Sequence, residues 1–152
     1  MDLTEADRRI LRLLQRDARI SNQDLAEQVG LSASACWRRV KALEDAGIIA
    51  GYPAILHPEK AGLGFSAIVH VTLARHEAAP VTSFISRIRE RPEVVACFAT
   101  TGEADYHLRV VCRDKDAYND FLDEFLFKLP AVAHVRTNLV LKSIKLQSEL
   151  PL

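Results

Sequence analysis

The stretch SNQDLAEQVGLSASACWRRVKALEDAG, residues 21–47, decides how the first third of the chain is organised. A short polar side chain at its start, Ser21 or Asn22, caps a helix, and Gly30 ends that helix. A serine then begins a second helix, which runs to Gly47. The pattern therefore predicts two short helices joined by a tight corner.

The second of these helices carries two dissimilar rows of side chains. At about 100° per residue, its apolar side chains point to a common interior, while polar ones point away from it. Residues 32–43 hold three cations and no anion, although the whole chain carries 20 Lys+Arg against 20 Asp+Glu. The predicted buried row is Cys36, Val40 and Leu43, and the predicted outward row is Ser34, Arg38 and Lys41.

An earlier helix completes this N-terminal part. Thr4 and Asp7 have the spacing of a capping box, and an apolar stripe then continues to about Asp17. Three helices with a glycine corner predict a helix-turn-helix domain over residues 1–50. In this motif the second helix enters the DNA major groove, where arginine and lysine recognise guanine. The predicted DNA-binding residues are Ser32, Ser34, Trp37, Arg38, Arg39 and Lys41.

These side chains also have simpler interpretations. A run of cations on a helix is usually a solvated face. The Trp37 indole fits a half-buried place against the first helix as well as it fits stacking on a deoxyribose. Arg39 lies beside the buried row, where an ion pair or a phosphate contact suits it better than base recognition. The coincidence of cap, corner, small Ala26 and cationic row favours DNA binding.

The rest of the chain alternates between two periods. After an extended connector over residues 51–64, apolar residues recur at every second position over 65–73, as in a strand. Helical spacing follows over 80–90. The segments VVACFATT and YHLRVVC then form a hairpin, a helix covers 116–129, and VAHVRTNLVL is the last strand. This βαββαβ order predicts a ferredoxin-like domain over residues 65–152 and an overall α+β fold class.

Composition excludes several classes of protein. A net charge of zero argues against a protein that coats nucleic acid indiscriminately. No apolar run approaches the roughly 18 residues of a membrane span, and MDLTEADRR does not resemble a secretory signal. The cysteines Cys36, Cys97 and Cys112 are odd in number and far apart. They fit reduced thiols in the cytoplasm, where we expect the protein, and we expect all three in the core.

Two segments resemble one family of bacterial regulators. ISNQDLAEQVGLSASACWRRVKALEDAGIIAGYPAILHPEKAGLG is similar to the N-terminal half of the Lrp/AsnC family, and TTGEADYHLRVV is similar to that family's effector loop. The resemblance extends over nearly the whole chain. It implies a transcriptional regulator that binds double-stranded DNA, responds to an amino acid, and forms homodimers that assemble further, often into octamers. The CWRR helix and the LPL ending resemble a branch that responds to cysteine, with a branched-chain amino acid as the alternative effector.

The loop TTGEADY, residues 100–106, is the candidate effector site. A zwitterionic amino acid needs donors for its carboxylate and an acceptor for its ammonium group. Gly102 lets backbone N–H groups approach a ligand closely, Thr101 adds a hydroxyl, and Glu103 or Asp105 balances the ammonium charge. The residues alone fit an ordinary hairpin turn. The resemblance implies effector contacts by Thr101, Gly102, Glu103, Asp105, Tyr106 and Asn138.

The predicted sheet has one polar face. Contact with solvent is its simplest use, and the resemblance implies a dimer interface between two such sheets. The histidines on this face lack the close ligand spacing of a zinc site, so we expect no metal and no cofactor. The predicted outer-face residues are Ser66, His70, Thr72, His107, Arg109, His134, Arg136 and Asn138.

Two rival functions follow from the same features. Haem-pathway decarboxylase subunits resemble this two-domain arrangement, and histidines on the outer face would then act as acid and base groups. The cationic helix would have no purpose in such an enzyme, and the sequence holds no nucleophile–base pair or phosphate loop, so we predict that the chain is not an enzyme. The second rival is a stand-alone amino-acid-binding module whose N-terminal helices only pack against partners.

Overall fold

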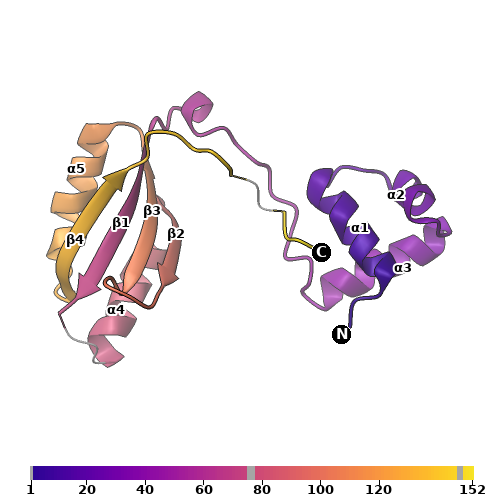
Figure 1. Ribbon diagram of the computed structural model, residues 1–152, viewed down its shortest axis with the longest axis horizontal. Coiled ribbons are helices and arrows are strands. Elements are labelled where there is room, and N and C mark those ends of the chain that lie inside the picture. Colours follow the sequence, from indigo (N-terminus) through magenta and orange to yellow (C-terminus); the bar gives the residue numbers. More distant parts are fainter. Residues whose placement is uncertain (1, 75–77, 147–148) are drawn as a thin grey trace. The chain divides into compact units, whose positions relative to one another are not determined.

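The computed structural model describes residues 2–74, 78–146 and 149–152, and the chain forms two compact units (Figure 1). The first unit contains residues 1–55 together with 144–152, and the second contains residues 56–143. The sequence pattern assigned the C-terminal segment to the second domain. It joins the first unit because Leu150 and Leu152 contact the N-terminal helices.

The first unit is a bundle of three helices: α1 (Glu5–Arg16), α2 (Asn22–Val29) and α3 (Ala33–Asp45). Serine or threonine caps each N-terminus, as predicted, and Gly30 ends α2 in the left-handed conformation, with φ 73°. That conformation favours glycine because a Cβ atom would be strained there. The tight corner brings α3 back across α2, and buried apolar residues fill the interior. They are Ile10, Leu11, Leu25, Ala26, Val29, Cys36 and Leu43.

The second unit is an antiparallel sheet with two helices on one face. The segment before it is extended apart from a short 3-10 turn, η1 (Glu59–Ala61). The strands lie in the order β2-β3-β1-β4, so β1 and β3 are central (Figure 1). The elements are β1 (Phe65–Leu73), α4 (Ala78–Arg89), β2 (Val94–Ala99), β3 (Tyr106–Cys112), α5 (Lys115–Glu124), η2 (Leu126–Lys128) and β4 (Val132–Leu139).

Alternation along β1 sets the two faces of this sheet. Ala67, Val69 and Val71 are fully buried, and they pack with Phe84 of α4 and Phe121 of α5. The intervening side chains of β1 point to the opposite face, which neither helix covers. The predicted α+β fold, with a ferredoxin-like βαββαβ order after a helix-turn-helix unit, is confirmed.

The prediction that Cys97 belongs to the core is wrong, because its side chain is exposed. Cys97 pairs with the buried Leu108, so it faces the helix-covered side. However, β2 is an edge strand with only one neighbour, and its pairing with β3 shifts register between Val94 and Ala96. Such an irregularity twists an edge strand away from regular pairing. Cys36 and Cys112 are buried, as predicted.

The last helix is shorter than predicted. Helical spacing extended to residue 129, whereas α5 ends at Glu124 and the 3-10 turn η2 follows it. Leu129 has extended backbone angles, φ −76° and ψ 118°. It precedes Pro130, whose ring disfavours a helical conformation in the residue before it. Apolar residues beyond the helix still reach the core, and Leu126 is fully buried.

Candidate functional site

The outward row of α3 is accessible, as the helical period predicts. Ser34, Arg38 and Lys41 are all exposed, and Ser32 caps the helix beside them through a hydrogen bond from the Ala35 N–H group. Within the part of the chain that the structure describes, Arg38 makes no hydrogen bond or ion pair. A free guanidinium on the N-terminal half of this helix has the geometry that base recognition in a major groove requires.

Lys41 is exposed but its charge is partly balanced on its own helix. Its Nζ lies 2.9 Å from a carboxylate oxygen of Asp45 and 3.8 Å from one of Glu44. The hydrogen bond and the charge of Asp45 raise the pKa of Lys41. To contact a DNA phosphate, the Lys41 ammonium group must therefore leave the carboxylates of Asp45 and Glu44.

Arg39 is partly buried and is bonded to the start of α1. Its Nη1 donates to Oδ1 of Asp7 at 2.8 Å and to the hydroxyl of Thr4 at 3.0 Å. Asp7 is the fully buried carboxylate of the capping box at the start of α1. Burial raises the pKa of Asp7, but the hydrogen bonds from Thr4 and Arg39 outweigh it and lower that pKa overall. Arg39 thus makes the ion pair that its position beside the buried row suggested.

Trp37 stands on the flank of α3 with 58% of its surface exposed. It borders a shallow cavity of about 220 Å³ in the first unit, with Leu14 and Tyr52 among the other lining residues. The Tyr52 hydroxyl donates to Glu44 at 2.9 Å, and burial together with that carboxylate raises the pKa of Tyr52 to about 12. The indole is therefore partly covered beside Leu14 of α1, and more than half of its surface stays exposed.

The loop between β2 and β3 is anchored by Asp105. Its carboxylate accepts a hydrogen bond from the Leu73 N–H group at 2.7 Å, and its own N–H group donates to the Val71 carbonyl at 3.0 Å. The Thr72 hydroxyl donates a hydrogen bond to the Glu103 carbonyl at 3.4 Å. These contacts fix the loop against the end of β1. The Asp105 carboxylate is therefore bonded to the backbone of Leu73 and helps to hold the loop in place.

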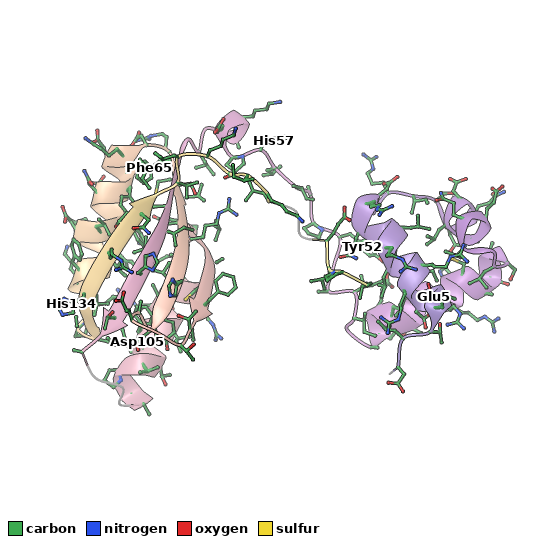
Figure 2. The ribbon with its side chains drawn as sticks, in the orientation of Figure 1. Glu5, Tyr52, His57, Phe65, Asp105 and His134 are labelled. Atoms are coloured by element: carbon green, nitrogen blue, oxygen red, sulfur yellow. The ribbon has the colours of Figure 1, made fainter. Side chains whose placement is uncertain are left out.

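A cavity of about 230 Å³ opens beside this loop. Charged groups of both signs border it, and Nη1 of Arg136 lies 3.4 Å from Oε2 of Glu103. Figure 2 shows Asp105 and His134 at the same end of the sheet, opposite the end where Phe65 lies. The lining residues are His70, Thr72, Glu103, Ala104, His134, Val135 and Arg136.

Of the predicted effector residues, only Glu103 lines this cavity. Thr101 and Gly102 are exposed in the loop, where Gly102 has φ 112°. Tyr106 packs against Phe84 on the helix-covered face, with ring centroids 4.9 Å apart. Asn138 lies on the outer face, where its amide nitrogen is 3.3 Å from Nε2 of His70.

Two family models match the chain. A winged helix-turn-helix DNA-binding model matches residues 3–50, and the Lrp/AsnC ligand binding domain model matches residues 66–150. The chain belongs to the Lrp/AsnC family. This confirms the family resemblance and the pairing of a DNA-binding domain with a ligand-binding domain.

Individual relatives of the Lrp/AsnC family match nearly end to end. The Bkd operon transcriptional regulator of Pseudomonas aeruginosa is 42% identical over 151 residues, covering 99% of both chains. The transcriptional activator DecR of Escherichia coli is 37% identical over 150 residues, again covering 99% of both. The structure resembles that of the transcriptional regulator NMB0573 of Neisseria meningitidis in complex with L-Met, with TM-score 0.94, 40% identity and coverage of 99% and 97%. The chain is therefore a DNA-binding transcriptional regulator and not an enzyme.

The polar cavity residues from β1 and β4 could be found in the sequence only as outer-face positions. Thr72 pairs with His134, and His70 pairs with Arg136, so each pair lies side by side across β1 and β4. Alternation placed them on the polar face, but the register that aligns them with the loop comes from strand pairing. The sequence of this Lrp/AsnC chain therefore identifies the β2–β3 loop as a candidate site. It does not identify the neighbouring strand residues, because their position depends on the register of strand pairing.

The rest of the outer face is not covered by α4 or α5, and it combines polar side chains with the exposed Phe98. One row across the four strands consists of Phe98, His107, His70 and Arg136. The His70 and His107 rings meet edge to face with centroids 4.6 Å apart. Burial, and then His107 and Arg136, lower the pKa of His70. Among the described residues, no group of three or more potential metal ligands is close enough to hold an ion, and no helix in those ranges is long and apolar enough to cross a membrane.

Proposed function

We propose that this Lrp/AsnC regulator is sequence-specific and that its effector is an amino acid bound in the cavity beside the β2–β3 loop. The observation that carries the proposal is the pairing of Arg136 with Glu103 at the mouth of that cavity. An amino acid carries one carboxylate and one ammonium group. A guanidinium and a carboxylate held 3.4 Å apart offer one partner for each.

The existing Arg136–Glu103 pair is easily exchanged for a ligand. The side chains are 62% and 86% exposed, and exposed ion pairs contribute little net stability. Binding replaces this weak contact with two contacts that the ligand bridges. The complex of the Neisseria regulator with L-Met supports an amino acid as the effector class here. Cysteine and the branched-chain amino acids are the first candidates for this chain.

On the DNA side, Arg38 and Ser34 contact base edges, and Ser32, Trp37 and Lys41 contact the backbone. Arg39 supports α3 through Asp7 and contributes to DNA binding indirectly. The part of the outer face beyond the effector cavity pairs two chains into a homodimer, and dimers assemble further, up to an octamer. Two recognition helices of a dimer then meet half-sites about one helical turn, ~34 Å, apart.

Regulation follows from linkage between the two sites. An effector changes the free energy of DNA binding only by the difference between its own binding free energies for the two assemblies. This coupling free energy is typically about 1–3 kcal/mol. The operator contacts include phosphates, so the affinity falls steeply as salt increases.

The test is a thermal-shift screen of the full chain against the twenty amino acids, followed by DNA binding to the region upstream of its own gene. A ligand that binds the native state raises its melting temperature. Arg136→Ala should abolish the shift. Arg89→Ala, an exposed arginine on α4 that does not line the cavity, should retain it. A shift that survives Arg136→Ala would remove the cavity from the proposal.

A further inference from the structure

Helix α1 holds the segment at residues 149–152 through a side-chain amide. Leu150 donates its N–H group to Oε1 of Gln15 at 2.6 Å, and its carbonyl accepts from Nε2 of Gln15 at 3.2 Å. A glutamine amide presents a donor and an acceptor side by side. Gln15 therefore satisfies both backbone groups of Leu150, as a neighbouring β-strand would.

Two arginines of the same helix hold the residues on either side. Nη1 of Arg12 donates to the Leu152 carbonyl at 2.9 Å, and Nε of Arg16 lies 3.8 Å from a carboxylate oxygen of Glu149. Arg12, Gln15 and Arg16 are spaced three and four residues apart, so they share one face of the helix.

The contact is also apolar. The Leu152 side chain packs against the buried cluster of the three-helix unit. Pro151, between the two leucines, has no N–H group to satisfy and restricts the backbone of Leu150 to extended conformations. Both backbone groups of Leu150 and the carbonyl of Leu152 have partners on α1, and the Leu152 side chain is partly buried. Residues 149–152 are therefore docked on a surface formed by α1 and the apolar cluster beneath it.

We infer that residues 149–152 are a strap that couples the effector domain to the DNA-binding unit. The chain passes between the two units at residues 55–56 and again at residues 143–144. The second passage continues directly from β4, the strand that carries His134 and Arg136 into the cavity. We expect a displacement of β4 to reach α1 along this passage, separately from the connector before β1. The coupling role rests on the proposed function, whereas the docking itself does not.

Docking is tested by hydrogen exchange at the Leu150 amide in the full chain. Gln15→Ala removes its acceptor, and we expect exchange to become about tenfold faster, the change that loss of one hydrogen bond produces. Arg8→Ala is the matched control, because Arg8 lies on the same helix and, within the described ranges, has no hydrogen bond or ion pair with residues 149–152. An unprotected Leu150 amide in the unchanged protein, or equal rates in both variants, would overturn the docking.

Coupling is tested with the same variants by measuring DNA affinity with and without the amino acid found in the screen. In Gln15→Ala the ratio of the two affinities should fall toward one, while effector binding and effector-free DNA binding persist. A strap that is released without any change in this ratio has no coupling role. If the unchanged protein binds no DNA or no amino acid, the proposed function and the coupling both fail, whereas the exchange rates still decide the docking.

Discussion

Arg38 and Arg39 are adjacent in the sequence, yet the structure predicts very different effects on stability when each is replaced by alanine. Arg38 is exposed and makes no hydrogen bond or ion pair within the described residues. Arg39 donates to the carboxylate of Asp7, whose side chain is fully buried. We therefore expect Arg39→Ala to unfold the N-terminal unit more easily, and Arg38→Ala to leave its stability almost unchanged.

The size of the Arg39 effect follows from what Asp7 retains. Removing one partner of a buried ion pair costs about 3–5 kcal/mol when the other charge is left without any partner. Here Asp7 keeps the hydrogen bonds from the Thr4 hydroxyl and N–H group, and the Arg39 side chain is 38% exposed. Both facts reduce the loss, to about 2 kcal/mol in the free energy of unfolding.

Urea unfolding followed by tryptophan fluorescence measures this directly. Trp37 is the single tryptophan of the sequence, so its emission reports on the N-terminal unit alone. With a slope of about 1 kcal/mol per M urea, typical of the smallest domains, Arg39→Ala lowers the midpoint by about 2 M. Midpoints for Arg39→Ala and Arg38→Ala that agree within error would refute the assignment of Arg39 to the ion pair.

The pH dependence of this loss provides an internal control. The pKa of Asp7 is lowered in the folded state, so its contribution to stability is present above the unfolded pKa of 3.8. That contribution disappears as the pH falls through the folded-state pKa and the carboxylate becomes protonated. The difference between Arg39→Ala and the unchanged protein should therefore shrink at the acidic end of the range.

Further predictions concern the two sites and the sheet. Arg38→Ala should relax base preference, and each lost guanine contact should cost about 1–3 kcal/mol of discrimination when a set of mutated operators is compared; unchanged preference would contradict its role. Asp105→Ala should free the loop, abolish the thermal shift by the effector and leave DNA binding intact; a normal shift would show that effector binding does not depend on this anchor. Because the pKa of His70 is lowered from 6.5 in the folded state, protonation of His70 favours the unfolded state. The stability of the second unit should therefore fall as the pH drops below 6.5, and His70→Gln should make stability depend less steeply on pH. Alkylation under native conditions should label Cys97 before the buried Cys36 and Cys112, as measured by mass spectrometry of the digested protein. Earlier labelling of either buried cysteine would contradict this order.

Local rules predicted the helices and strands well because they act over a few residues. The Thr4 cap, the Gly30 corner and the alternation along β1 each depend on near neighbours in the chain. The end of α5 was predicted less well, because the effect of Pro130 on its preceding residue competes with an apolar spacing that continues to Leu129.

Features that depend on distant residues could not be predicted in this way. Cys97 has the alternation of a core residue, but its exposure is determined by the position of β2 at the edge of the sheet. Arg136 stands more than thirty residues from Glu103, and the two meet because β4 pairs with β1 and the loop is anchored to the end of β1. Docking of Leu150 on Gln15 joins residues 135 positions apart. No periodicity within one segment carries such information.

The three-helix unit is built from two segments that lie far apart in the sequence, which has a consequence for its synthesis. A ribosome releases α1, α2 and α3 long before it has translated Glu149 and the residues after it. Until then Gln15 and the two arginines beside it remain solvated. Each newly made regulator therefore completes its DNA-binding half only after the ligand-binding domain has been synthesised, and a chain truncated within β4 would leave the face of α1 without residues 149–152.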